Sequence, residues 1–318
     1  MAFEEYFIGK RERLSWVDET SYGSGGDMES DGEIIGYNAT ITPNFNQNWE
    51  ELLTAGSDSR AVEDHIVTKL DYPFTLTFSP VNWKFLKYLG YSVADAGSGP
   101  YTHTFTLRNS VQSFKLEWAR RGSTHSVITL IGAVAISGTI SFSKPAGAGN
   151  SMIVVSLNCV AKSASEGSSI SSLSNISDSP FQYRHTKLTL NNNEIVELNS
   201  GNLTIDQSIN PDDSRYCNAT LDRTIGEPIP KTQRITGTFN VNIKDNTFWN
   251  LWNGASTINN CSLDFIQSSS LKLEGAFAGF KLDQPNSPTN LEGVTNANLV
   301  FRATGFSSLV ATDSNSTY

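Results

Sequence analysis

Cysteines, charged residues and long apolar runs are all scarce in this sequence of 318 residues. Charged residues make up 17% and hydrophobic residues 38%, against about 25% and 45–50% in average globular domains. The three cysteines, Cys159, Cys217 and Cys261, are too few and too scattered for a disulfide framework or a CxxC metal site. No apolar run approaches the ~18 residues of a transmembrane helix. The opening Met-Ala-Phe-Glu-Glu also lacks the basic and apolar regions of a secretory signal.

Basic residues are outnumbered as well. The sequence has 23 Lys and Arg against 32 Asp and Glu, which gives a formal net charge of −9. Proteins that grip nucleic acid need clusters of Lys and Arg for the phosphates. The composition therefore disfavours a nucleic-acid-binding protein.

Motifs for catalysis or metal binding are missing too. The histidines, His65, His103, His125 and His185, have no second ligand at a metal-binding spacing. The acidic stretch 27–32 imitates the start of a calcium loop, but it lacks the closing Glu and the flanking helices. No Gly-x-Ser-x-Gly lies at a strand-to-helix turn. We expect no enzyme activity, no metal and no cofactor.

Alternation with a period of two residues dominates what is present. Apolar side chains alternate with Asn and Thr over residues 37–45, and a period of two continues from Ile66 to Phe78. A polar face opposite an apolar one is typical of half-buried antiparallel strands. Further strands are predicted at 102–107, 112–119, 126–131, 133–143, 152–162, 185–191, 202–210, 232–244, 261–266, 270–282 and 294–304.

An internal repeat is the most informative feature. At an offset of 164 residues, 38–46 aligns with 202–210, and at 165 the strand 70–78 aligns with 235–243. Each long strand is followed by a short amphipathic segment with helix-start residues, 79–89 or 245–252. We therefore predict two tandem copies of one unit.

A serine-rich connection separates the two copies. Residues 165–182 contain few large apolar side chains, which is typical of a linker. The predicted organisation is an N-terminal arm or loop (1–35), a first domain (36–164), the linker (165–182), a second domain (183–310) and a C-terminal tail (311–318). The arm has no counterpart in the second copy, and we expect it to reach a neighbouring subunit or ring.

Two long connections and several aromatic residues are candidate contact sites. The stretches 47–65 and 211–231 exceed the ~12–15 residues beyond which an unstructured connection is usually functional or disordered. Trp16 and Trp49 fall in predicted loops, and exposed rings of this kind are enriched at interfaces. The residues predicted to contact another subunit or ring are Trp16, Tyr22, Trp49 and Tyr216.

Short segments in both halves carry a resemblance to a known family. They are SWVDETSYG at 15–23, GYNATI at 36–41, FLKYLG at 85–90, KLTLNNN at 187–193, GNLTI at 201–205 and GTFNV at 237–241. Together they resemble a tail tube protein, the major tail protein of long-tailed viruses of bacteria or archaea. The version resembled has two tube domains in one polypeptide, and the resemblance covers nearly the whole chain.

The resemblance implies an all-β fold with two tandem β-sandwich or split-barrel domains, each with a short flanking α-helix. It implies that adjacent sheets join edge to edge around a channel, and that three chains form a pseudo-sixfold ring. Rings would stack into a tube through which viral DNA passes. The implied partners are further copies of the chain and the tape-measure and tail terminator or tip proteins, with no membrane. The implied location is the virion tail, after assembly in the host cytoplasm.

A channel for DNA favours an acidic lining, because negative charge repels the phosphates and lets DNA slide. We expect some of the following acids to face the channel: Asp71, Glu117, Asp206, Asp264 and Glu274.

Other classes remain open. One is another virion structural or receptor-binding component, or a carbohydrate-binding β-sandwich module that stacks its Trp and Tyr rings on sugar. A glycoside hydrolase would need two carboxylates about 5–10 Å apart, and the sequence selects no such pair. Polymerisation into hollow filaments would favour the tube protein over both.

Overall fold

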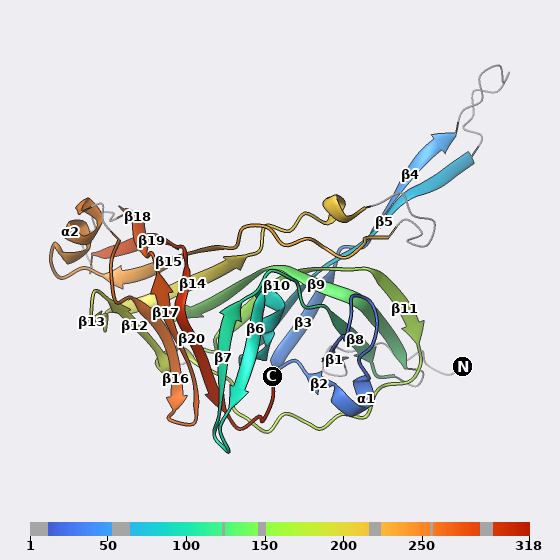
Figure 1. Ribbon diagram of the computed structural model, residues 1–318, viewed down its shortest axis with the longest axis horizontal. Helices are drawn as coiled ribbons and strands as arrows, with labels where there is room; N and C mark the ends of the chain where they lie inside the picture. Colours follow the sequence, from blue (N-terminus) through green and yellow to red (C-terminus); the bar gives the residue numbers. More distant parts are fainter. Residues whose placement is uncertain are drawn as a thin grey trace, which may run out of the picture.

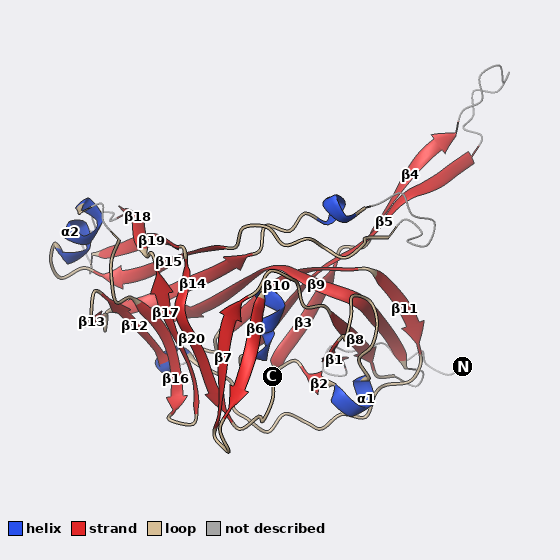
Figure 2. Ribbon diagram, in the orientation of Figure 1, coloured by secondary structure: helices blue, strands red, loops and turns tan. Residues whose placement is uncertain are grey.

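Within the part of the chain that the structure describes, two antiparallel sheets, one of 13 strands and one of 7, make up the fold (Figures 1 and 2). The computed structural model describes residues 12–52, 64–122, 125–145, 151–215, 224–254, 257–286 and 295–318. Helices within these ranges are short, and the all-β prediction is confirmed.

Strands from both halves of the sequence contribute to each sheet. The larger sheet contains β1 (Glu12–Asp18), β2 (Glu33–Ile34), β3 (Tyr37–Pro43), β4 (Asn46–Leu52), β5 (Asp64–Ser79), β8 (Phe114–Arg120), β9 (Ser126–Ser143), β10 (Val154–Ala161), β11 (Ser163–Gly167), β14 (Leu198–Asp206), β15 (Arg234–Asn242), β18 (Lys281–Asn286) and β19 (Asn296–Ala303). The smaller sheet contains β6 (Tyr91–Ala96), β7 (Tyr101–Leu107), β12 (Thr186–Leu190), β13 (Asn193–Glu194), β16 (Ser262–Ser268), β17 (Leu271–Ala278) and β20 (Gly305–Asp313). The α-helices among the described residues are α1 (Met28–Asp31) and α2 (Thr247–Asn253), and the 3₁₀ helices there are η2 (Lys84–Leu89), η3 (Tyr183–His185) and η4 (Pro211–Ser214).

The main path of the larger sheet repeats one order of strands. Read from its β3 end, the path is β3-β5-β10-β9 followed by β14-β15-β19-β18. The two groups of four also match in their irregularities. The ladder of β9 with β10 skips Ile136, and the ladder of β18 with β19 skips Asp283. The ladders of β3 with β5 and of β14 with β15 are also interrupted near the same end.

These ladders correct the sequence alignment in register. In the structure Ile41 pairs with Leu76, whereas Ile205 pairs with Ile235. The sequence offsets of 164 residues for β3 and 165 for β5 would instead pair Ile205 with Val241, so they cannot both describe equivalent positions in the two units. Matching the ladders places Ile41 at the position of Gly201, and Leu76 at the position of Phe239. Alternation fixes which face a residue takes but not its position along the strand, because a two-residue slip leaves the faces unchanged.

The described part of the predicted N-terminal arm lies in the chain's own larger sheet. β1 pairs along its whole length with β8, and β2 pairs with β1. At the other end of the chain, β20 pairs with β7 and the ring of Tyr318 stacks on His103 at 3.6 Å.

The segment that contains η2 fills the space between the two sheets. Phe85, Leu86, Tyr88 and Leu89 are all buried. Just before this helix, Trp83 is fully buried and stacks on Phe265 of β16, with ring centroids 5.0 Å apart. This contact joins the first half of the chain to the second.

Lys87 of η2 is also buried, and its ammonium pairs with Asp18 of β1. Burial is the main cause that lowers the pKa of Lys87 from 10.5 to about 8, and nearby Lys84 acts in the same direction. The unfolded chain thus binds this proton more tightly than the folded chain. The free energy of unfolding then rises as the pH increases between these two pKa values. Below both values, the loss of stability caused by burying the charged Lys87 is constant.

Replacing Lys87→Met is expected to remove this pH dependence. Between pH 7.5 and 9.5 the wild type should gain about 2 kcal/mol of stability relative to the variant. Urea unfolding of both proteins at several pH values measures the difference, because the other groups that titrate in this range are present in both proteins. Parallel curves for both proteins would contradict the assignment.

Candidate functional site

One face of the larger sheet carries rows of hydroxyl and amide side chains, which we call the polar face. One row crosses six strands through Thr42, Thr75, Asn158, Ser137, Asp206 and Arg234, each opposite the next. A second row runs through Thr40, Thr77, Ser156, Thr139, Thr204 and Thr236. The row between them is mostly apolar and points to the core, as the period of a strand requires.

Hydrogen bonds link the side chains across the polar face. Thr75 donates to the amide oxygen of Asn158 at 3.1 Å, and Asn158 donates to the Ser137 hydroxyl at 3.1 Å. The hydroxyls of Thr139 and Thr204 lie 3.0 Å apart across the β9–β14 junction. The polar face is therefore a continuous surface that crosses from the first half of the chain to the second.

The charge on these two rows balances. Asp206 is their acid and Arg234 their base, and the two residues are opposite each other on β14 and β15. The other side chains of the two rows are neutral hydroxyls and amides. Such groups hydrogen-bond to water and carry no fixed charge.

The five predicted channel acids do not share one surface. Asp206 lies on the polar face, and Asp71 lies further along β5, where it pairs with Arg215 and with Lys69 at 3.1 Å. Glu117 is 4% exposed on β8, and it accepts hydrogen bonds from Arg13 and Ser171, both at 2.6 Å. The prediction that Glu117 faces a channel is therefore wrong, because its carboxylate is buried within the chain.

Asp264 and Glu274 lie opposite each other on β16 and β17, in the smaller sheet. Asp264 accepts from the Gly275 amide at 3.1 Å and from Ser262 at 3.0 Å, and burial raises its pKa. Glu274 pairs with Lys272 at 2.8 Å. These two acids are separated from the polar face by the core between the sheets.

Trp16 is not the exposed ring that the sequence predicts. It lies in β1 with 2% of its surface exposed, and its ring packs edge-on against Phe78 and Tyr88. Its indole N–H donates to Glu33 at 2.7 Å. The missed signal is a strand over 12–18, in which Leu14, Trp16 and Val17 are all buried.

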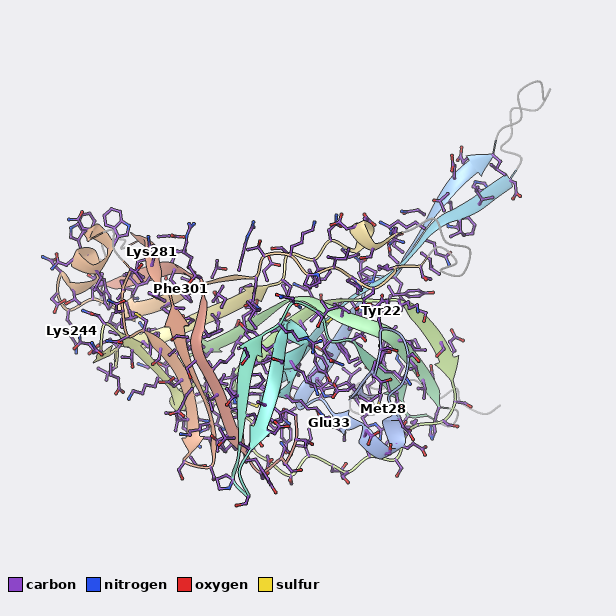
Figure 3. The ribbon with its side chains drawn as sticks, in the orientation of Figure 1. Tyr22, Met28, Glu33, Lys244, Lys281 and Phe301 are labelled. Carbon is purple, nitrogen blue, oxygen red and sulfur yellow. The ribbon has the colours of Figure 1, made fainter. Side chains whose placement is uncertain are left out.

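Tyr22 and Trp49 have different surroundings. Tyr22 is half-buried near the root of the β4–β5 hairpin (Figure 3), with the ammonium of Lys162 5.4 Å from its ring centre. Trp49 is 57% exposed on β4. Tyr216 lies outside the described residues.

The stretch 47–65, which the sequence predicts to be a long loop, is largely a hairpin where the structure describes it. β4 pairs with the first half of β5, and the hairpin projects from the body of the molecule (Figure 1). Trp49, Leu52 and Ile66 are exposed on it. The second stretch, 211–231, begins with η4 at the hairpin root, where Asp212 pairs with Lys69 at 2.8 Å. Both predicted contact segments thus meet at one place.

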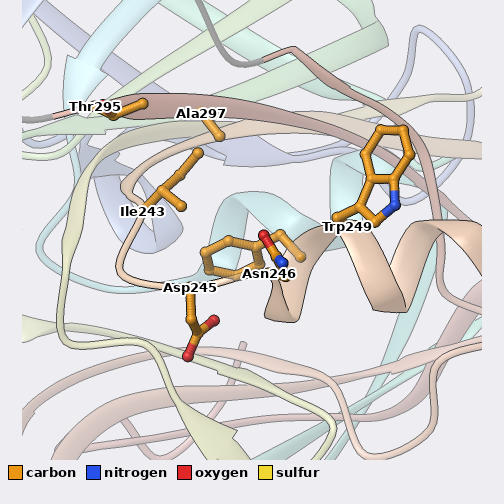
Figure 4. Close-up of a pocket in the computed structure, with 7 residues that line it drawn as sticks. Ile243, Asp245, Asn246, Trp249, Thr295 and Ala297 are labelled. Carbon is orange, nitrogen blue, oxygen red and sulfur yellow. The ribbon is translucent and has the colours of Figure 1, made fainter. Parts of the chain in front are cut away.

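The opposite end of the larger sheet carries α2. Trp249 is 55% exposed beside a cavity of about 360 Å³ that Ile243, Asp245 and Phe248 help to line (Figure 4). The ring centroids of Trp252 and Trp249 are 4.9 Å apart, and the indole N–H of Trp252 donates to the Asp283 carbonyl at 3.0 Å. The segment 245–252, predicted to be amphipathic like 79–89, therefore leaves Trp249 largely exposed, whereas the apolar side chains of η2 are buried.

A buried cluster around His103 is the nearest approach to a catalytic arrangement. His103 is fully buried, with Asp95 at 2.6 Å and Asp313 at 3.1 Å. The ring of Tyr318 covers it, so the cluster holds β7, β20 and the last residues together. Among the described residues, no group of His, Cys, Asp or Glu side chains could hold a metal ion. The described part of the chain also has no helix long and apolar enough to span a membrane.

A comparison with protein families covers nearly the whole chain. The model of the phage tail tube protein family matches residues 9–303. The chain therefore belongs to the phage tail tube protein family, whose members are structural components of the virion that assemble into the tail tube. A search of the curated proteins gives no match.

Proposed function

We propose that three copies of the chain form a pseudo-sixfold ring, and that rings stack into a tube through which viral DNA passes. The observation that carries this proposal is the repeated order β3-β5-β10-β9 and β14-β15-β19-β18 across one sheet. Two equivalent four-strand units per chain would make six per ring. We also propose that the units arose by internal duplication and correspond to the tandem domains 36–164 and 183–310. Residues 165–182 would connect them.

The polar face is the proposed wall of the channel. Hydroxyls and amides hold a layer of water without offering fixed positive charge to phosphates, so DNA would slide along them. Asp206 and Asp71 are the two predicted acids that such a wall would carry, and each already has a basic neighbour. The tube would be wetted and close to neutral inside.

The hairpin of β4 and β5 is the proposed contact between stacked rings. It projects from the body, and it presents exposed apolar side chains, which mark interaction sites on soluble proteins. The tape-measure and tail terminator or tip proteins remain proposed partners, and the host cytoplasm the proposed site of assembly.

Replacing Trp49→Ser is expected to weaken stacking without unfolding the chain. Central interface tryptophans often contribute about 2 kcal/mol or more, which corresponds to a rise of roughly 30-fold in the concentration needed for tube formation. Light scattering during a dilution series measures that concentration. The matched control is Glu50→Ser on the other face of β4, which should leave it unchanged. Equal effects of both variants would contradict the role of Trp49.

Electron microscopy of concentrated purified protein tests the proposed function. Negatively stained samples should contain hollow filaments of uniform width. A protein that stays monomeric at high concentration would contradict the proposal.

A carbohydrate-binding module is the second candidate, because Trp249 is exposed beside a cavity. This candidate predicts saturable oligosaccharide binding by a non-polymerising protein, and loss of that binding on Trp249→Ser.

A further inference from the structure

The junction between β9 and β14 is an edge-to-edge contact between the two four-strand units. Across it, Thr139 is opposite Thr204, Gly138 is opposite Ile205 and Ser137 is opposite Asp206. Gln207 follows directly, and its backbone N–H donates to the Ile136 carbonyl at 3.0 Å. Its buried side chain donates to the Ala135 carbonyl at 2.6 Å and to the Tyr88 carbonyl at 3.0 Å.

The path of the larger sheet ends in the same two kinds of edge. β18 occupies in the second unit the position that β9 occupies in the first, and β3 occupies the position of β14. Within the described residues, β18 pairs with β19 and has no strand on its other side. The described part of β3 likewise pairs with β5 alone.

The skipped residues fix which positions on β9 and β18 correspond. Ser137 pairs with Asn158 just after the skipped Ile136. Gln284 pairs with Val300 just after the skipped Asp283. Gln284 of β18 is therefore the structural equivalent of Ser137 of β9. By the same count, Pro285 is equivalent to Gly138, and Asn286 to Thr139.

The corresponding comparison places β3 on β14. Thr40 pairs with Thr77 after the interruption in one unit, and Ser200 pairs with Asn240 after it in the other. Counting onward from Thr40 and Ser200, Phe45 takes the position of Ile205. Gln47 then takes the position of Gln207. The residue that hydrogen-bonds across the internal junction is therefore a glutamine in both units.

Burial differs sharply between these equivalent positions. Ile205 is fully buried under the β9–β14 junction, whereas Phe45 is 39% exposed. Leu203 is buried, and Pro43 at its equivalent position is exposed. The β3 end thus carries apolar side chains that remain partly exposed in the described chain.

The backbone at Phe45 is already turned for pairing. The N–H of Asn44 donates to the Pro73 carbonyl on the β5 side at 2.9 Å. Successive residues of an extended chain point their N–H and C=O groups to opposite sides. The N–H and C=O of Phe45 therefore face the open edge.

We propose that β18 of one copy pairs antiparallel with the β3–β4 corner of a second copy, in the register of the β9–β14 junction. Phe45 is then opposite Pro285, Asn44 is opposite Asn286, and Gln47 reaches the carbonyls at the end of α2 and in β18. The contact is head-to-tail, so it generates a ring when the rotation closes. This inference rests on the proposed function and specifies the contact within one ring.

Two features of β18 limit nonspecific pairing at its free edge. Pro285 has no N–H, so the contact has one hydrogen bond fewer than its internal counterpart. The indole of Trp252 occupies the Asp283 carbonyl, which corresponds to the carbonyl that accepts from Gln207. Proline and covering elements are common protections of sheet edges against aggregation.

A disulfide between copies tests the register. The variant carries Asn44→Cys and Asn286→Cys in a Cys217→Ser background, because Cys159 and Cys261 are buried. The positive control is Thr139→Cys with Thr204→Cys, the equivalent pair inside one chain. The negative control is Thr40→Cys with Asn286→Cys, which lies four residues out of register, or about 13 Å along the strand.

Oxidation of assembled protein followed by non-reducing electrophoresis should give covalent dimers and trimers from the test pair, with no larger species. The negative control should stay monomeric. Tubes visible by electron microscopy without cross-linking of the test pair, while the positive control oxidises, would overturn the pairing and leave the tube function standing. Protein that neither cross-links nor forms tubes would overturn both. Covalent species larger than three chains on the gel would support the paired edges and contradict a three-chain ring.

Discussion

Replacing Phe45→Asp is expected to abolish tube formation while the single chain stays folded. Phe45 is partly exposed and contacts Tyr72 edge-on, with ring centroids 5.5 Å apart, so the folded chain should lose only about 1 kcal/mol. In the proposed three-chain assembly, the variant removes a buried aromatic side chain. It also places a carboxylate in an apolar contact, which is costly when no positive charge or hydrogen-bond donor is near. The concentration needed for assembly should rise more than about 100-fold, which corresponds to about 2.7 kcal/mol.

The matched variant is Ile205→Asp, which makes a similar apolar-to-acid change at the equivalent position inside the chain. Ile205 is fully buried, so this variant should lose more than about 4 kcal/mol of folding stability. Urea unfolding of both variants, with light scattering of Phe45→Asp, separates folding from assembly. Normal tubes from Phe45→Asp would contradict the proposed contact.

Replacing Trp83→Ala is expected to destabilise the whole molecule by about 3–5 kcal/mol. Trp83 touches Phe265 from the second half of the chain and Phe181, whose ring centroid is 4.9 Å away. The cavity left behind would lie between the two sheets, where neither side can collapse freely. Chemical denaturation followed by far-ultraviolet circular dichroism measures the loss.

The control for this prediction is Trp249→Ala, which removes the same side chain from an exposed position on α2. It should change the free energy of unfolding by less than about 0.5 kcal/mol. Equal losses from the two substitutions would contradict the assignment of Trp83 to the common core.

The all-β fold can be predicted from the sequence because alternation is a local property. The pattern from Ile66 to Phe78 becomes the long strand β5, and the short helix after it becomes η2. The register of the repeat cannot be predicted this way. Ile235 is apolar, as are Phe239 and Val241 on the same face, so several slips by two residues bury a similar set.

The candidate site is predictable only in part, because burial depends on distant segments. The Thr and Asn faces of β3 and β5 are visible in the sequence, and they do lie together on the polar face. The core position of Trp16 depends on β8 and η2, and the burial of Glu117 depends on Arg13 and Ser171. None of these partners is near in the sequence.

The most consequential residues have no distinctive sequence pattern. Phe45 and Ile205 are both ordinary apolar residues in alternating segments, and only the order of strands makes them equivalent. Their different exposure then identifies the β3 end as incomplete. A sequence shows which edges exist only after the topology is known.

A cryo-electron-microscopy reconstruction of assembled tubes tests the central claim most directly. The map should show the larger sheets joined around the channel, with β18 of one copy beside the β3 end of the next and the polar face lining the lumen. A lumen lined by the smaller sheet, or rings in which β3 and β18 stay unpaired, would contradict the account.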